Sequence, residues 1–215
     1  EYFREATWDE ALDIAANGFK KLKQQRNGKS NMAGFGSAKC SNEEAYLFQK
    51  LIRTGLNTNN VDHCTRLCHA SSVAALLETI GSGAVTAPFY EVQHSEVVIV
   101  IGANPNENHP VAATFFKNAV KKGTKLIVMD PRGHSLKKHA THMLQFKPGS
   151  DVALLNSIMN VIIEEKLFNT SYIKEHTTGF EELKTHLKNY SPEIMASETG
   201  IKPQVIREIA RLYAN

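Results

Sequence analysis

Cysteine is scarce in this sequence, and long apolar runs are missing. The 215 residues contain three cysteines. This odd number does not make the disulfide framework of a small secreted domain, so a reducing compartment is favoured. No apolar stretch approaches the about 18 residues that a membrane-spanning helix needs. The chain starts at Glu1-Tyr2-Phe3-Arg4, with neither an initiator methionine nor the apolar centre of a signal peptide, so we expect a piece of a longer polypeptide.

A strong excess of charge of one sign is also missing. The 25 Lys and Arg residues against 22 Asp and Glu residues give a formal net charge of +3. The lysines form short, separate groups at residues 20–23, 121–122 and 137–138. A nucleic-acid surface needs basic residues clustered on one face, so nucleic-acid binding is not predicted.

The common nucleotide-binding fingerprints are absent too. Gly34-Phe35-Gly36 lacks the third glycine of the G-x-G-x-x-G sequence, and no Walker sequence occurs. An ordinary NAD-binding domain or a kinase is therefore not favoured. Internal repeats and low-complexity segments do not occur, and the 42% hydrophobic content is that of a globular protein.

Continuous aliphatic runs predict the centre of the fold. Val97–Ile101 and residues 126–129 are apolar without alternation, as in parallel strands that helices cover on both faces. Residues 110–122, with proline in the first turn, supply the crossover helix between them. A third strand at 143–146 leads into a helix from 151 to about 165. We therefore predict an α/β fold, a Rossmann-like αβα arrangement with a mostly parallel sheet.

The rest of the chain is predicted to be mainly helical. Thr7-Trp8-Asp9-Glu10 and Ser41-Asn42-Glu43-Glu44 read as capping boxes. Their helices should end at Asn27-Gly28 and at Gly55, with a short strand at 32–36 between them. Further helices are expected at residues 72–80, around Tyr172, and at 180–187, 192–197 and 203–213.

These elements suggest two domains. Residues 1–62 form the N-terminal helix-strand-helix part of a second αβα domain, and residues 63–215 form the Rossmann-like domain.

Three loops follow the predicted strands, and ligands of such sheets bind beyond the carboxyl ends of strands. The first, residues 102–110, offers a glycine for close backbone approach and amides at a helix start for a phosphate. The second, Asp130-Pro131-Arg132, offers a carboxylate for a ribose or guanine edge and a guanidinium for a phosphate. The third, Pro148-Gly149-Ser150-Asp151, presents amides and a carboxylate together. Each loop is also compatible with simple turn or N-cap chemistry, but together they favour a nucleotide-type ligand.

The segment around Cys68 is the most informative part of the sequence. Two thiols and two imidazoles, His63, Cys64, Cys68 and His69, fall within seven positions. Cys68 is a soft metal ligand beside a residue that moves protons near neutral pH, which suggests redox metal chemistry. Two alternatives remain: a zinc site from these four residues, although adjacent side chains diverge, and two buried, inert thiols. Cys40 stands apart and is expected to be structural.

Taken together, these motifs resemble the molybdopterin oxidoreductase superfamily and, within it, the catalytic alpha subunits of formate dehydrogenases. The pair Cys68-His69 is the sharpest feature of this resemblance, because related nitrate reductases lack the histidine. The similarity extends nearly end to end, over residues 7–12, 36–39, 59–62, 64–71, 102–110, 130–132, 147–155 and 178–181.

The resemblance implies specific roles. Cys68 is the protein ligand of molybdenum or tungsten, and His69 accepts or relays the proton released from formate. Cys64 has no ligand role. Glu107 stands where some relatives have Asp. The residues that would hold one molybdopterin guanine dinucleotide are Gly102, Asn104, Glu107, His109, Asp130, Arg132, Gly149 and Asp151.

The resemblance also implies the function of the intact protein. It would oxidise formate to carbon dioxide with a bis-molybdopterin guanine dinucleotide that carries molybdenum or tungsten. Electrons would leave through a four-iron four-sulfur cluster, in a segment preceding Glu1. They would pass to iron-sulfur or flavin subunits of an NAD-linked cytoplasmic complex. The formate-binding arginine would follow residue 215, and Arg66 does not replace it, so the 215 residues alone should have no turnover.

Two other functions remain compatible with the sequence. One is a different molybdopterin oxidoreductase, such as a nitrate reductase. The other is a non-catalytic scaffold, as in the related large subunit of respiratory NADH dehydrogenase, although the retained Cys68-His69 pair argues against it.

Overall fold

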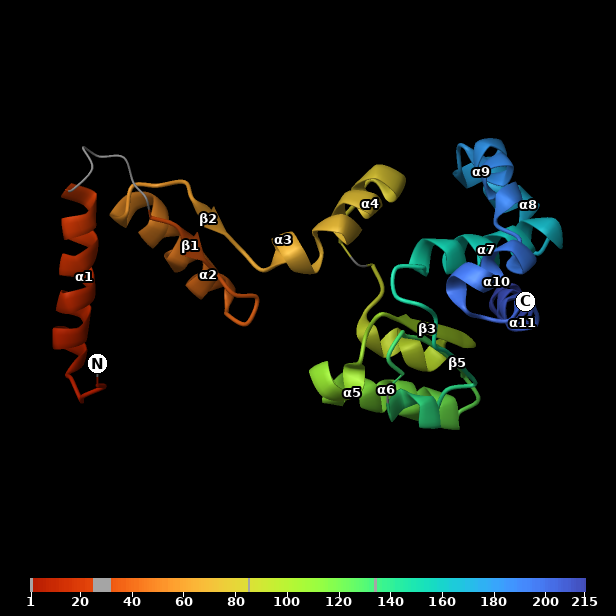
Figure 1. Ribbon diagram of the computed structural model, residues 1–215, viewed down its shortest axis with the longest axis horizontal. Helices are drawn as coiled ribbons and strands as arrows, with labels where there is room; N and C mark the ends of the chain where they lie inside the picture. Colours follow the sequence, from red (N-terminus) through yellow and green to blue (C-terminus); the bar gives the residue numbers. More distant parts are fainter. Residues whose placement is uncertain (1, 25–31, 85, 134) are drawn as a thin grey trace. The chain divides into compact units, whose positions relative to one another are not determined.

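The computed structural model describes residues 2–24, 32–84, 86–133 and 135–215. They form two compact units, Glu1–Thr86 and Ala87–Asn215 (Figure 1). The described residues build a two-stranded and a three-stranded parallel sheet among many helices, which confirms the predicted α/β class. The boundary predicted after residue 62 concerns the domains of the intact protein and stays a prediction. None of the helices in the described part is both long enough and apolar enough to cross a bilayer.

The second unit is built on the three-stranded sheet. Its strands β3 (Val97–Ile101), β4 (Lys125–Met129) and β5 (His142–Leu144) pair in this order, all parallel. Helix α6 (Pro110–Lys121) connects β3 to β4, so the predicted strand-helix-strand unit is confirmed. Strand β5 ends before the predicted residue 146, because β4 has already ended at Met129 and leaves no further partner.

The remaining helical elements of this unit are short or follow the sheet. They are η2 (Phe89–His94), α5 (Pro105–Asn108), η3 (Ser135–Lys138), α7 (Asp151–Glu164), α8 (Thr170–His176), α9 (Phe180–His186), η4 (Leu187–Asn189), α10 (Pro192–Thr199) and α11 (Pro203–Ala214).

Both faces of the sheet are buried, which explains the continuous apolar runs. Ile127 and Met129 of β4 join a core with residues of α7 and α11. Leu126 and Val128, which alternate with them, join a second core with Phe116 of α6. In Figure 1, α6 lies on one side of the sheet and α7 and α11 lie on the other. Because successive residues point to opposite faces, a strand buried on both sides needs apolar residues at every position.

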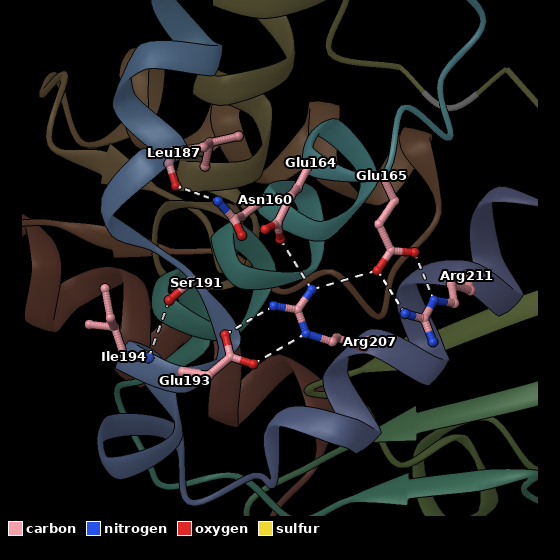
Figure 2. Close-up of polar contacts among 9 residues, drawn as sticks. All are labelled: Asn160, Glu164, Glu165, Leu187, Ser191, Glu193, Ile194, Arg207 and Arg211. Atoms are coloured by element: carbon pink, nitrogen blue, oxygen red, sulfur yellow. Dashed lines mark hydrogen bonds and ion pairs between the residues drawn. The ribbon is translucent and has the colours of Figure 1, made fainter.

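Ion pairs join the helices α7, α10 and α11 (Figure 2). Arg207 of α11 donates to Glu164 at 3.1 Å and, through two nitrogens, to Glu193 of α10 at 3.0 and 3.2 Å. Arg211 donates to Glu165 at 2.7 and 2.8 Å. The hydrogen bonds from Arg211 hold the pKa of Glu165 below its ordinary value, and those from Arg207 do the same to the pKa of Glu193. These contacts fix α11 against α7 and α10.

The first unit is assembled from short elements. They are α1 (Trp8–Gln24), β1 (Gly34–Phe35), α2 (Asn42–Lys50), the π-helical turn η1 (Leu51–Gly55), β2 (Val61–Asp62), α3 (Thr65–Cys68) and α4 (Ala70–Ile80). Strands β1 and β2 pair in parallel.

Most of the local predictions for this unit are confirmed. Ser41 and Glu44 form the complete capping box at the start of α2, with bonds of 3.2 and 2.7 Å. At the start of α1, the amide of Glu10 donates to Thr7 Oγ1 at 3.2 Å, but the Glu10 carboxylate pairs with Arg4 instead of closing a box. Asn27-Gly28, the predicted end of α1, lies outside the described residues.

The core of the first unit is small. Among its described residues, Met32, Ile52 and Leu56 are the buried hydrophobic side chains, with Phe48 and Val61 packed against them. Strand β1 approaches η1 so closely that a Cβ atom on Gly34 would lie 2.5 Å from Ile52 side-chain atoms. The predicted strand at 32–36 is shortened to two residues, the length of its partner β2.

Candidate functional site

Cys68 and His69 lie side by side between two helices of the first unit. Cys68 is the last residue of α3, and His69 separates α3 from α4. The Sγ atom of Cys68 is 3.6 Å from Nε2 of His69, and the thiol is exposed. The structure therefore places a soft ligand atom next to an imidazole nitrogen, a pair that suits metal binding together with proton transfer.

The alternatives for this segment do not fit the geometry. Among the described residues, no group of three or more His, Cys, Asp and Glu side chains could hold a metal ion, so the zinc site is not supported. Cys68 is exposed and Cys64 is half-buried, which argues against two buried, inert thiols. Cys40 is also exposed, and its thiol donates to the carbonyl oxygen of Ser37 at 3.0 Å.

In the second unit, the three predicted loops leave the same edge of the sheet. Ile101, Met129 and Leu144, the last residues of the three strands, are neighbours in the ladder. The amide of Gly102 donates to the carbonyl of Met129 at 3.0 Å, and the amide of Asp130 donates to the carbonyl of Leu144 at 3.1 Å. The starts of the first two loops are therefore tied to the neighbouring strand, and the carboxyl ends of the three strands lie at one edge of the sheet.

The first loop, after β3, combines an open glycine with a buried amide. Gly102 has φ +60°, and no heavy atom of the described residues outside its neighbours lies within 4 Å of the place of a Cβ atom. Asn104 is 6% exposed, yet its Oδ1 atom finds no donor in the part of the chain that the structure describes. Glu107 and His109, on and just after α5, are exposed.

In the second loop, after β4, a side-chain carboxylate bonds to a backbone amide of the same loop. Asp130 is 5% exposed and its Oδ1 accepts the amide of Arg132 at 2.8 Å. The carbonyl of Arg132 in turn accepts the side-chain amide of Gln145 at 3.3 Å. This arrangement leaves the guanidinium of Arg132 exposed beside the edge of the sheet.

The third loop, before α7, is not capped in the usual way. Gly149 has φ +84° and open space where a side chain would be. The hydroxyl of Ser150 donates back to the carbonyl of Lys147 at 2.7 Å, so it does not cap the amides of α7. Asp151 lies exposed in the first turn of α7. Free helix amides of this kind favour an anionic ligand.

The residues of this edge fit a phosphorylated dinucleotide. The open glycines allow a ligand to approach the backbone, and the start of α7 offers amide donors. The unmet Oδ1 of Asn104 offers an acceptor, and the exposed guanidinium of Arg132 offers a positive charge for a phosphate.

Sequence reasoning missed two side chains of these regions. Asn106 has a second buried amide oxygen without a donor among the described residues, and its nitrogen donates to Ser135. The duplicated asparagine of Asn104-Pro105-Asn106 was the signal for it. His63 was considered only as a zinc ligand, although both of its ring nitrogens are hydrogen-bonded within the first unit.

The chain is similar to known proteins over nearly its whole length. The family model of molybdopterin oxidoreductase matches residues 1–203. The alpha subunit of F420-dependent formate dehydrogenase 1 of Methanococcus maripaludis is 42% identical over 98% of this chain, which spans 31% of that relative. The catalytic subunit of the assimilatory nitrate reductase of Bacillus subtilis is 36% identical over 99% of this chain and 30% of its own length.

The chain is also similar to a solved structure. Acetylene hydratase from Pelobacter acetylenicus superposes with a TM-score of 0.74 at 28% identity, covering 98% of this chain and 28% of the other. The 215 residues thus correspond to about a third of the length of the curated relatives that they match. Because the family model covers nearly the whole chain, this protein belongs to the molybdopterin oxidoreductase family.

Proposed function

We propose that the complete protein is a molybdopterin-dependent formate dehydrogenase. The observation that carries the proposal is the contact between Cys68 and His69, with 3.6 Å between Sγ and Nε2, on an exposed segment. The similarity to a formate dehydrogenase alpha subunit over nearly the whole chain supports it.

In this proposal the two residues have separate tasks. Cys68 holds the metal through its thiolate, since a soft sulfur ligand suits molybdenum or tungsten. His69 takes up the proton that formate releases as it becomes carbon dioxide, a task suited to an imidazole near neutral pH. When bound, the bis-molybdopterin guanine dinucleotide supplies the acceptor for the two electrons of formate.

The second unit binds one of the dinucleotides. Gly102 and Gly149 admit it to the backbone, Asn104 and Asp130 contact its polar edges, and Arg132 neutralises a phosphate. Glu107, His109 and Asp151 complete this set.

Electrons then leave through a four-iron four-sulfur cluster outside the 215 residues. Iron-sulfur or flavin subunits of an NAD-linked cytoplasmic complex receive them. The free cysteines support a reducing compartment.

The test uses the complete natural protein. We expect formate-dependent reduction of a dye, and Cys68→Ser should lower kcat by about a hundredfold or more, because the hard hydroxyl is a poor ligand for the metal. Cys64→Ser is the matched control and should retain activity, since Cys64 has no ligand role. Nitrate reduction without formate oxidation would replace the proposal with its first alternative, which the nitrate reductase relative supports.

Metal analysis separates the proposal from a non-catalytic scaffold. Molybdenum or tungsten should be present in the purified complete protein in amounts near one per polypeptide. Protein that is fully folded but contains neither metal would favour the scaffold.

A further inference from the structure

We infer that His63 is the positioning residue for the segment that carries Cys68, holding helix α3 against the loop that follows β1. The inference rests on the proposed function, in which Cys68 and His69 do the chemistry. It concerns the side chain that keeps these two residues in place.

The start of α3 has no ordinary cap. Cys64 occupies the N-cap position and makes no side-chain capping bond. Instead, Nδ1 of His63 accepts the amide of Thr65 at 3.1 Å, and it lies 2.8 Å from the Thr65 hydroxyl. The imidazole therefore satisfies the amide of the first helical residue, as an N-cap Ser or Asp satisfies that of the second or third.

The second ring nitrogen ties the helix to another part of the unit. Nε2 of His63 lies 3.0 Å from the carbonyl oxygen of Ser37, in the loop after β1. Since the Thr65 amide is always a donor, Nδ1 is the acceptor, and Nε2 then carries the proton and donates to Ser37. With both nitrogens used, His63 has none left for a metal.

Backbone hydrogen bonds of α3 connect Thr65 and Cys64 to the reacting pair. The carbonyl of Thr65 accepts the amide of His69 at 3.1 Å, and the carbonyl of Cys64 accepts the amide of Cys68 at 2.9 Å. A ring that fixes Thr65 therefore fixes the single turn on which both functional residues sit. Helices this short are not stable by themselves, so the turn depends on such anchors.

The experiment compares His63→Ala and His63→Asn in the complete protein. Asn keeps an acceptor oxygen near the place of Nδ1 and restores the cap, while Ala removes it. Hydrogen exchange of the amides at residues 64–69 should be about fivefold faster in His63→Ala and near the natural rate in His63→Asn. Cys40→Ser is the control, because it keeps a donor to the same Ser37 carbonyl.

Activity gives the second measurement. In His63→Ala, kcat with formate should fall about tenfold with KM for formate and metal content unchanged, because Cys68 and His69 are misplaced rather than lost. His63→Asn should recover most of the rate. Unchanged exchange, or faster exchange with an unchanged kcat, overturns the inference; if the natural protein lacks formate oxidation, exchange still decides whether His63 anchors α3.

Discussion

Asn104 is one of the described residues whose buried side chain has a polar atom without a partner. Its Oδ1 is buried without a donor, although a buried polar atom without a partner costs about 1–3 kcal/mol. Such a cost is tolerated where a ligand supplies the missing bond. Asn104 lies three residues after β3 at the carboxyl edge of the sheet, where the proposed dinucleotide would offer a donor group.

The substitution Asn104→Ala tests whether this unpaired oxygen serves a ligand. Asn104→Ala removes the unmet acceptor, so the cofactor-free protein should keep its stability to within about 1 kcal/mol. The purified protein should contain about tenfold less cofactor, because the ligand loses its partner. Fluorescence of the released, oxidised pterin measures this content, and thermal unfolding of the cofactor-free protein measures stability.

Asn160 provides a matched control on α7. Its Oδ1 is also unmet among the described residues, but its nitrogen donates to the carbonyl of Leu187 at 2.9 Å (Figure 2). Asn160→Ala should therefore lower stability by about 1 kcal/mol and leave the cofactor content unchanged. Equal cofactor loss in both variants would remove the case for Asn104 as a ligand.

At the scale of elements, the sequence predicted the strands that are determined by burial. It missed the short helix that depends on single contacts. Strands β3 and β4 were predictable because both faces of the sheet are covered, so every residue from Ile127 to Met129 had to be apolar. Helix α3 was not predicted. Its one turn depends on the ring of His63, which no hydrophobic period reveals. The strand-end loops and their two asparagines were visible in the sequence, but that both amide oxygens are buried without a donor needed coordinates.

The ion pairs of α7, α10 and α11 give a prediction on pH. Glu165 and Glu193 have pKa values below the ordinary value of 4.5 in the folded protein. Their contribution is therefore present above about pH 4.5 and lost as the pH falls through the lower, folded values. Glu193 is exposed and Glu165 is half-buried at the surface, so solvent screens both pairs and the effect is modest.

Arg207→Met tests the origin of this sensitivity. Between pH 6.5 and pH 3.5 the urea midpoint of a polypeptide of residues 87–215 should fall, and it should fall less in Arg207→Met because one source of the lowered pKa is gone. Lys184→Met removes an exposed ion pair with Glu181 at 3.6 Å. Its urea midpoint should fall by as much as that of the natural sequence. The same drop in all three would assign the acid sensitivity to other groups.

At the scale of the molecule, the two units differ in how much they bury. The second unit has two core clusters, one on each face of its sheet, with fully buried side chains such as Leu154 and Ile206. In the first unit, α1 has no buried residue, and Leu12, Phe19 and Leu22 on it are exposed. Apolar area removed from water is the main stabilising term of folding, so the units should differ in independent stability.

We therefore expect a polypeptide of residues 87–215 to fold by itself and one of residues 1–86 not to. The second unit has the size of common single domains and a core between two layers of helices, so its urea unfolding should be cooperative. Leu154→Ala, in the core between β4 and α7, should lower its stability by about 2–5 kcal/mol.

The first unit should show a broad transition and rapid amide exchange, because its few buried side chains do not offset the loss of chain entropy. A sharp transition for residues 1–86 alone would mean that its short contacts, the cap by His63 among them, stabilise it more than its small core indicates.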